Sequence, residues 1–330
     1  MVVMKVLVTG ASGFIGSTLV KQLNEKKWDV RVLLRKTSSV EGLKGLSYEI
    51  VYGSLTDFES LKRACTGIDV VIHLAGVTSA KTRSDYFKMN ADGVALLVEA
   101  CEQVNPTLKR FLLVSSLAAA GPSYNGVPRT ERDQEQPVSW YGESKKEGEL
   151  FLEKSRLRYT IIRPPAVYGP RDRGVFQFIQ PISKNILPVI PPITTGEKKF
   201  SFVYVDDLCS GIIESLSSDV TLNQVYFLCE DHIYSYSEMT RLVSQCLRKK
   251  PFKITVPLWL LKALAFLGTF YGKVTHKTPM LNLDKFNELV ADYWICSNEK
   301  AKKDFNYQTR WPLSKGLSKT IRWYQENSWL

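Results

Sequence analysis

A tyrosine and a lysine, Tyr141 and Lys145, stand four positions apart in the polar run "YGESK". Four residues make about one helical turn, so on a helix the phenol and the ammonium would share a face. A tyrosine with an ordinary pKa near 10 is a poor base at neutral pH, and a cation within about 4–6 Å favours the phenolate. The pair could therefore perform acid–base chemistry, or it could belong to an ordinary exposed helix face.

Three glycines, Gly10, Gly13 and Gly16, lie in "TGASGFIG" between a strand-like run and a segment with helical periodicity. Glycine is needed where such a turn is sharp, where the backbone meets a pyrophosphate and where the helix packs on the strand. The phosphates would lie at the helix N-terminus, among free N–H groups. A glycine spacing alone is weak evidence, but this strand–turn–helix context predicts dinucleotide binding.

Strand-like and helix-like segments alternate through the first half of the chain. Apolar or β-branched runs predict strands at 5–10, 29–35, 48–55, 69–76, 110–121 and 159–170, and helical periodicity predicts helices at 14–28, 57–67, 90–105 and 144–155. This alternation indicates an α/β fold, a Rossmann-type doubly wound parallel sheet with helices on both faces. Several of the strand runs are apolar throughout, as expected for strands buried on both faces.

The pattern loosens after residue 170, where a proline-rich loop at 188–199 precedes a turn into a helix at 201–216 and a strand at 223–230. We expect an NAD(P)-binding Rossmann domain at 1–170, to which some later segments return, and a smaller, mainly substrate-binding α/β region at 171–330. The apolar stretch 257–272 is too short to span a bilayer and contains Lys262. It is expected to be a buried or lid helix, with contact to a membrane or a lipid-like substrate as the alternative.

The chain has a net charge of +11, and its basic residues are spread along the sequence. This distribution indicates a solvated basic surface, part of which could serve an anionic cofactor or substrate. We expect no nucleic-acid partner. The six cysteines are scattered among only three histidines, so we expect no metal site, and cysteines that act as small core residues in a reducing compartment. The opening "MVVMK" leads directly into a strand, which is not a signal-peptide pattern. A cytoplasmic protein is expected.

Further motifs accompany the glycine loop and "YGESK": "HLAG" at 73–76, "VSS" before "AAAG", "RPPAVYGP" at 163–170 and "FVYVDDL" at 202–208. With the closing segment 297–324, this set resembles the extended short-chain dehydrogenase/reductase family, within the NAD-dependent epimerase/dehydratase superfamily. The resemblance extends over essentially the whole chain. It implies a nicotinamide-dependent enzyme.

The resemblance implies a catalytic set of Ser116, Tyr141, Lys145 and Asn90. Tyr141 would be the general acid/base, Lys145 would bind the nicotinamide ribose and lower the tyrosine pKa, and Ser116 would hydrogen-bond the substrate oxygen. Ser116 is preferred to Ser115 because its register and its interval to Tyr141 match the family pattern, and Ser115 would point to the other side of the strand. Asn90 would support the lysine through backbone and water, or simply cap a helix.

The resemblance also implies a cofactor site made of Gly10, Ser12, Gly13, Phe14, Ile15, Gly16, Arg35, Ser54, Leu55, Leu74, Ala75, Gly76, Tyr141, Lys145, Pro164 and Val167. NAD-dependent members usually carry an acidic residue at the end of the second strand, where this chain has Arg35. A guanidinium suits the 2′-phosphate of NADP, so NADP is preferred, unless Arg35 is an ordinary surface residue. Ser54 stands where the family usually has aspartate.

Three functions remain open. The first is hydride transfer between NAD(P) and a carbonyl or secondary alcohol on a largely apolar, steroid-like substrate, because "SSLAAAGPS" and the apolar stretch 257–268 resemble the 3β-hydroxysteroid-dehydrogenase-like and dihydroflavonol-reductase-like branch. The second is a nucleotide-sugar epimerase, with Lys198 or Lys199 holding phosphate in place of the usual arginine. The third is a catalytically silent cofactor-binding regulator. Dehydration is disfavoured, because Leu117, Ala118 and Ala119 supply no acid or base.

Four further expectations concern the surroundings of the site. The substrate's hydrophobic body would lie against Trp259, Leu261 and Phe266. Asp206 and Asp207 would cap a helix and brace the second region, and His73 would be a core residue at a strand end. The helices that carry Asn90 and Tyr141 would form a homodimer interface.

Overall fold

The computed structural model describes residues 4–194, 196–275 and 281–330. Its centre is a seven-stranded sheet in the order β11-β6-β5-β4-β1-β2-β3, in which every neighbouring pair is parallel. The strands are β1 (Lys5–Thr9), β2 (Asp29–Leu34), β3 (Glu49–Tyr52), β4 (Val70–His73), β5 (Arg110–Val114), β6 (Tyr159–Arg163) and β11 (Gln224–Phe227). This confirms the predicted doubly wound parallel fold.

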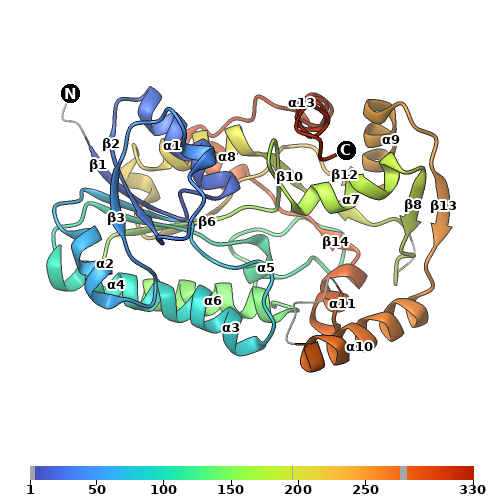
Figure 1. Ribbon diagram of the computed structural model, residues 1–330, viewed down its shortest axis with the longest axis horizontal. Helices are drawn as coiled ribbons and strands as arrows, with labels where there is room; N and C mark the ends of the chain where they lie inside the picture. Colours follow the sequence, from blue (N-terminus) through green and yellow to red (C-terminus); the bar gives the residue numbers. More distant parts are fainter. Residues whose placement is uncertain (1–3, 195, 276–280) are drawn as a thin grey trace.

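Helices cover both faces of the sheet (Figure 1). One face carries α1 (Phe14–Glu25) and α8 (Val205–Ser215), and the other carries α2 (Phe58–Cys65), α4 (Gly93–Val104) and α6 (Trp140–Glu153), with α3 (Arg83–Phe87) and the π-helical η2 (Lys88–Asp92) leading into α4. Successive residues of β1 serve opposite cores: Val6 and Val8 pack on the α1 side, and Leu7 packs on the α2–α4 side. The continuous apolar runs of the sequence follow from this two-sided burial.

Most of the remaining elements build the region that closes over the carboxyl ends of the strands. They are η1 (Glu41–Leu43), α5 (Leu117–Ala120), β7 (Ala166–Tyr168), α7 (Gly174–Ser183), β8 (Ile186–Val189), β9 (Lys199–Phe200), β10 (Phe202–Tyr204), η3 (Asp219–Thr221), β12 (Tyr234–Ser235), α9 (Tyr236–Leu247), β13 (Phe252–Thr255), α10 (Leu258–Thr275), α11 (Leu283–Val290), β14 (Tyr293–Trp294), α12 (Glu299–Phe305) and α13 (Leu313–Glu326). Three small sheets, β10-β7, β12-β9-β14 and β13-β8, connect them. Of these elements, η3 lies instead at the amino end of β5, and α12 packs against η3 and β11.

The boundaries of three predicted segments are wrong. The strand expected at 110–121 ends at Val114, because Ser116 caps the short helix α5 by accepting a hydrogen bond from the N–H of Ala118 at 3.1 Å. The strand expected at 159–170 divides into β6 and β7, separated by Pro164 and Pro165, which lack the N–H that a ladder requires. The expected turn before α8 contains the short strand β10.

Two later segments lie with the first half of the chain: β11 pairs with β6 at the edge of the main sheet, and α8 packs beside α1 (Figure 1). Asp207, in the first turn of α8, accepts hydrogen bonds from the N–H groups of Arg310 and Trp311, both at 3.0 Å. It therefore braces the C-terminal segment, as expected, but α8 begins without a side-chain cap, so the expected helix cap is wrong. His73 is buried at the end of β4, with its Nδ1 2.7 Å from the hydroxyl of Thr9, which confirms a core position.

We expected a buried or lid helix at 257–272, and the structure shows that this helix is not buried. Leu261 and Ala265 of α10 are buried, but Trp259 and Phe266 are 72% and 62% exposed. The helix packs against α11 at the outer edge of the molecule (Figure 1). Among the described residues, no helix is long and apolar enough to cross a membrane.

Candidate active site

A cavity of about 1820 Å³ opens at the carboxyl ends of the parallel strands, between the glycine loop and the C-terminal region. In open α/β sheets this edge is where ligands bind. The end of β5 and the loops that follow β1, β4, β5 and β6 form one side of the cavity. The other side comes from α7, β8, α9 and α11, so one cavity joins the expected cofactor and substrate regions.

The glycine loop forms the floor of the cofactor end. Gly10 adopts a φ of +74°, and a Cβ there would lie 2.7 Å from the main-chain nitrogen of Ala75. A Cβ on Gly16 would lie 2.2 Å from the carbonyl oxygen of Gly10. Side chains at these positions would push the helix away from the strand, so glycine keeps the N-terminus of α1 close to the cavity. This close packing leaves room for a dinucleotide pyrophosphate.

Helix α6 carries Tyr141 and Lys145 into the cavity. Ser116, the residue before α5, lines the same cavity. The cap residue Ser139 accepts a hydrogen bond from the N–H of Gly142 at 3.1 Å and donates one to Glu288 of α11 at 2.6 Å. A Cβ on Gly142 would lie 2.3 Å from the carbonyl oxygen of Ala118, so this glycine lets α6 approach α5. The start of α6 is therefore held tightly beside the serine-bearing turn.

Burial shifts the pKa values of Tyr141 and Lys145 in opposite directions. Burial raises the pKa of Tyr141 to about 12, although a hydrogen bond with Ser116 opposes that shift. Burial lowers the pKa of Lys145 to about 8, against the attraction of Glu149. Both shifts favour the neutral form. The protein alone therefore keeps the phenol protonated, which suits a proton donor.

Asn90 lies in η2 and is buried. Its Nδ2 donates to the carbonyl oxygen of Val77 at 2.9 Å and to the Ser144 hydroxyl at 3.0 Å, and its Oδ1 accepts from the N–H of Val77 at 2.8 Å. No side-chain cap accompanies η2, so the helix-cap alternative is wrong. Asn90 fastens the loop after β4 to α6, beside Lys145.

Most of the predicted cofactor residues line this one cavity, namely Gly10, Ser12, Gly13, Phe14, Ile15, Gly16, Leu74, Gly76, Tyr141, Lys145, Pro164 and Val167. Four of them do not. Arg35 is exposed just beyond β2, and the Ser54 hydroxyl lies 3.1 Å from that of Thr56. Leu55 is buried in the α2–α4 core, and Ala75 packs against the same core.

Ser115 and Arg171 are among the polar residues of the cavity that sequence reasoning missed. Ser115 was expected on the far side of the strand, but β5 ends at Val114, so the alternation of a strand no longer applies. Its hydroxyl is buried and has no hydrogen-bond partner among the described residues. Arg171 has a φ of +72°, and a Cβ on Gly42 would lie 2.2 Å from its Nη1. Its position after "RPPAVYGP" was the available signal.

Lys198 is held by its own protein. Its Nζ donates to the carbonyl oxygens of Leu289, Val290 and Ala291 at 3.2, 2.8 and 3.1 Å and pairs with Asp292 at 3.0 Å. An ammonium has three hydrogens, so these contacts use its whole donor capacity. Lys198 secures the end of α11 and is not free to hold a phosphate.

Apolar side chains dominate the cavity wall opposite the strands. They include Phe178, Pro188, Ile190, Phe200, Phe202, Met239 and Leu289. The residues expected to receive an apolar substrate, Trp259, Leu261 and Phe266, are not part of the cavity lining. Helix α10 instead packs on α11, and α11 supplies Lys285 and Leu289 to the cavity wall.

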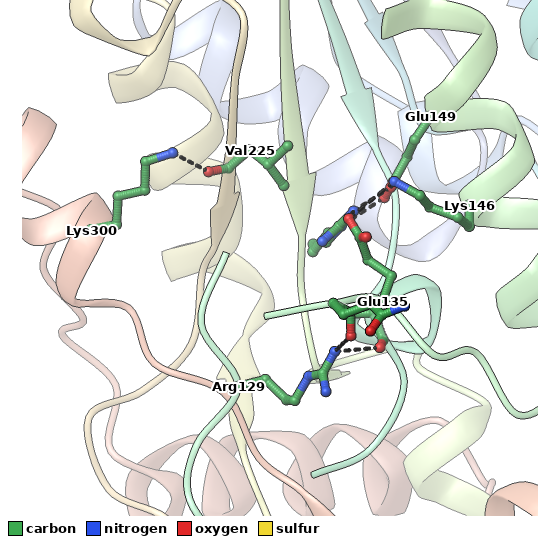
Figure 2. Close-up of polar contacts among 9 residues, drawn as sticks. Arg129, Glu135, Lys146, Glu149, Val225 and Lys300 are labelled. Atoms are coloured by element: carbon green, nitrogen blue, oxygen red, sulfur yellow. Dashed lines mark hydrogen bonds and ion pairs between the residues drawn. The ribbon is translucent and has the colours of Figure 1, made fainter. Parts of the chain in front are cut away.

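A buried ionic cluster supports α6 from beneath. Arg163, the last residue of β6, donates to Glu149 at 2.5 and 2.9 Å and to Glu135 at 2.9 Å. Figure 2 shows Lys146 and Glu149 reaching this cluster from the same helix, where Lys146 pairs with Glu135 at 3.0 Å. Burial alone would lower the pKa of Arg163, but Glu149 and Glu135 raise it. The cluster fixes α6 to the strand that leads to Pro164.

The edge strand and the loop before α6 have polar supports of their own. Lys300 of α12 donates to the carbonyl oxygen of Val225 in β11 at 3.0 Å, as Figure 2 shows. Arg129 donates to the carbonyl oxygens of Ala120 and Gln134 at 2.9 and 2.5 Å. The segment between α5 and α6 is therefore tied back to the turn that holds Ser116.

Comparison with known proteins agrees with this geometry. The model of the NAD dependent epimerase/dehydratase family matches residues 6–228. The ceramide reductase of Caulobacter vibrioides is 28% identical over 326 residues, covering 98% of this chain and 96% of that protein. The UDP-glucose 4-epimerase of Vibrio cholerae is 29% identical over 294 residues, covering 84% and 87%. The crystal structure of Thermotoga maritima UDP-glucose 4-epimerase with UDP-glucose superposes with a TM-score of 0.79 at 23% identity, covering 98% and 100%.

The chain therefore belongs to the NAD-dependent epimerase/dehydratase family. The resemblance to extended short-chain dehydrogenases/reductases that its motifs carry is confirmed.

Proposed function

We propose that this protein is an NADPH-dependent reductase that converts a carbonyl group on a largely apolar substrate into a secondary alcohol. It would catalyse the reverse oxidation when alcohol and NADP⁺ are in excess. The observation that carries this proposal is the apolar wall opposite the strands, built from residues such as Phe178, Phe200 and Leu289. Pockets place apolar side chains against apolar parts of their ligands. Full-length similarity to a ceramide reductase supports the same substrate class.

The residues of the cavity fit a nicotinamide dinucleotide. A Cβ at Gly10 or Gly16 would clash with main-chain atoms, so the loop keeps the close approach that a pyrophosphate uses. The hydroxyl of Ser115, which has no hydrogen-bond partner within the described part of the chain, offers a buried hydrogen-bonding group just beyond the end of β5. When bound, NADPH supplies the hydride that reduces the carbonyl carbon.

The chain's own residues manage the oxygen and its proton. Ser116 and Tyr141 lie together in the cavity, where both hydroxyls can hydrogen-bond the carbonyl oxygen. Tyr141 donates its proton to that oxygen as negative charge develops, which is general acid catalysis. Lys145 places its positive charge nearby, hydrogen-bonded to the carbonyl oxygen of Val114 at 2.7 Å. Its charge stabilises the phenolate that remains.

Two cations support NADP as the preferred cofactor. Arg35 follows β2 where an acidic residue would favour NAD. Arg171 lies against the 39–42 loop, which also lines the cavity, and burial lowers its pKa. Burial of a guanidinium without an anion is unfavourable, so a phosphate group close to Arg171 would relieve that cost.

The runner-up is a nucleotide-sugar epimerase, which the similarity to the Vibrio cholerae enzyme favours. Such an enzyme must hold a nucleotide diphosphate. The basic residue expected for that task, Lys198, is instead committed to three carbonyl oxygens and Asp292. Lys199 remains as the exposed alternative. The occupied lysine favours the reductase.

We propose that residues 1–170 with α8 and β11 form the cofactor domain, and that the rest of 171–330 mainly binds substrate. We further propose a homodimer that pairs α4 and α6 with their copies. Light scattering tests the dimer: twice the chain mass of 37.5 kDa supports it, and a single chain mass contradicts it.

The proposed reaction is tested by following NADPH absorbance with ketones on long-chain acyl or sterol-like bodies, with a short polar ketone as the matched control. Consumption of NADPH with the apolar ketones alone supports the proposal. Inversion of UDP-glucose without added cofactor or any change in absorbance would establish the epimerase instead.

A further inference from the structure

Helix α10 presents an unusually apolar surface to solvent. Trp259, Phe266, Leu267 and Phe270 are 72%, 62%, 60% and 62% exposed. Leu261 and Ala265, one turn apart, are buried at 7% and 0%. The helix therefore uses a narrow stripe to pack on α11 and leaves the rest of its apolar circumference uncovered.

The strand that leads into this helix extends the same surface. Phe252 and Ile254, at alternate positions of β13, are 79% and 51% exposed. Figure 1 shows β13 running along one edge of the molecule and passing into α10. Exposed apolar patches of this extent normally mark an interaction site.

The charged residues within this stretch of sequence are all basic. From residue 239 to residue 283 the sequence contains no aspartate or glutamate. Six basic side chains of the same stretch are exposed: Arg241, Arg248, Lys249, Lys250, Lys253 and Lys262. The next acidic residue, Asp284, is buried and accepts a hydrogen bond from the N–H of Trp140 at 2.6 Å. Glu197, from another part of the chain, interacts with Lys253, but the surface itself combines aromatic and aliphatic side chains with an excess of positive charge.

We infer that α10 and β13 form an interfacial binding surface for bilayers that contain anionic phospholipid. Tryptophan and phenylalanine enter the boundary between headgroups and acyl chains, while lysine and arginine meet the phosphate layer. A second copy of the chain would bring the same positive charge against itself, which disfavours a self-association surface here.

This surface adjoins the cavity. Helix α11, on which α10 packs, contributes Leu289 to the cavity wall, and β8, the partner of β13, contributes Pro188. Docking through α10 and β13 would bring these walls to the bilayer. The inference rests on the surface alone and holds whatever reaction the site performs.

Co-flotation of the full chain with vesicles tests the inference, with phosphatidylcholine alone and with phosphatidylglycerol added. We expect binding that requires the anionic lipid. The combined change Trp259→Ser, Phe266→Ser and Phe270→Ser should weaken it at least about 10-fold, because each removes a large apolar side chain from the interface. A matched control, Tyr52→Ser with Tyr124→Ser and Val127→Ser, alters exposed apolar side chains elsewhere and should leave binding unchanged.

The charge contribution is tested in the same assay. Lys249→Glu, Lys250→Glu and Lys253→Glu together should weaken binding roughly 100-fold or more, since each basic residue near the surface contributes about 1 kcal/mol. Lys26→Glu with Lys44→Glu and Lys303→Glu, exposed elsewhere, is the control. Circular dichroism melting curves show that each variant is folded.

Three outcomes would overturn the inference: no flotation of the parent with anionic vesicles, equal binding by the test and control variants, or dissociation of an oligomer by the apolar variant with no vesicle binding. The Tyr141→Phe protein should bind vesicles as the parent does. Failure of the proposed reaction is therefore distinguishable from failure of the docking surface.

Discussion

The ammonium of Lys145 donates a 2.7 Å hydrogen bond to the main-chain carbonyl oxygen of Val114, the last residue of β5. This bond joins the helix that carries the phenol to the strand end that carries the serine. Both partners are buried, and the low local dielectric strengthens the bond. The relative position of Ser116, Tyr141 and Lys145 is therefore set by the fold before any ligand arrives.

Replacing Tyr141 by phenylalanine should reduce turnover by roughly 100- to 10,000-fold, because the proton donor is lost. Cofactor affinity, measured by fluorescence titration with NADPH, should change little. Tyr86→Phe is the matched control, since Tyr86 lines the same cavity with its ring 6.2 Å from that of Tyr141, and it should keep most of the activity. Retention of more than about a tenth of the activity by Tyr141→Phe would remove Tyr141 from the role.

Replacing Lys145 by methionine should stabilise the folded protein at pH 7 while abolishing activity. Burial lowers the lysine pKa from 10.5 to about 8, which corresponds to a cost of about 3 kcal/mol for the buried ammonium, part of which the lost hydrogen bond offsets. Urea denaturation of both proteins measures the difference in the free energy of unfolding.

The pH dependence of that difference has a defined sign. Between pH 8 and pH 10.5 the unfolded lysine keeps its proton while the folded lysine has lost it, so the parent gains stability relative to Lys145→Met as the pH rises. Its contribution is lost again as the pH falls through about 8. A difference that is constant with pH, or that falls as the pH rises, would contradict the assigned pKa.

Arg35→Asp should move the cofactor preference from NADP toward NAD, because it removes a 2′-phosphate partner and adds repulsion. Arg171→Gln should weaken NADP binding as well if the phosphate lies against the 39–42 loop. Lys36→Asp, next to Arg35 and also exposed, is the control for a general change of charge. Tighter binding of NAD than of NADP by the unaltered protein would refute the NADP assignment.

Glu149→Ala should lower the free energy of unfolding by about 3 kcal/mol, because Arg163 would lose its main partner inside the protein. Both side chains are at most 1% exposed. The surface pair of Lys21 and Glu25 provides the control, and Glu25→Gln should cost less than about 1 kcal/mol. Equal stabilities of the two variants would show that Glu135 alone is enough to stabilise the buried Arg163 guanidinium.

Local patterns predicted the parts of the site that lie on one element. The strand–turn–helix around Gly10 and the one-turn spacing of Tyr141 and Lys145 are properties of short segments, and the structure has them as expected. The hydrogen bonds and the ion pair that occupy the Lys198 ammonium could not be predicted, because its partners lie more than ninety residues further along the chain. The exposure of α10 could not be predicted either. Its apolar sequence is compatible with burial, and only tertiary packing determines which of its faces are covered.

The most direct test of the reductase account is the fate of the hydride. The protein is incubated with an apolar ketone and NADPH that carries deuterium at the transferable position, and the product is examined by mass spectrometry together with the NADP⁺ released. We predict an alcohol that carries one deuterium on its carbinol carbon and one NADP⁺ released for each alcohol formed. Absence of labelled alcohol, together with inversion of UDP-glucose by the same preparation without added cofactor, would contradict the reductase and establish the epimerase.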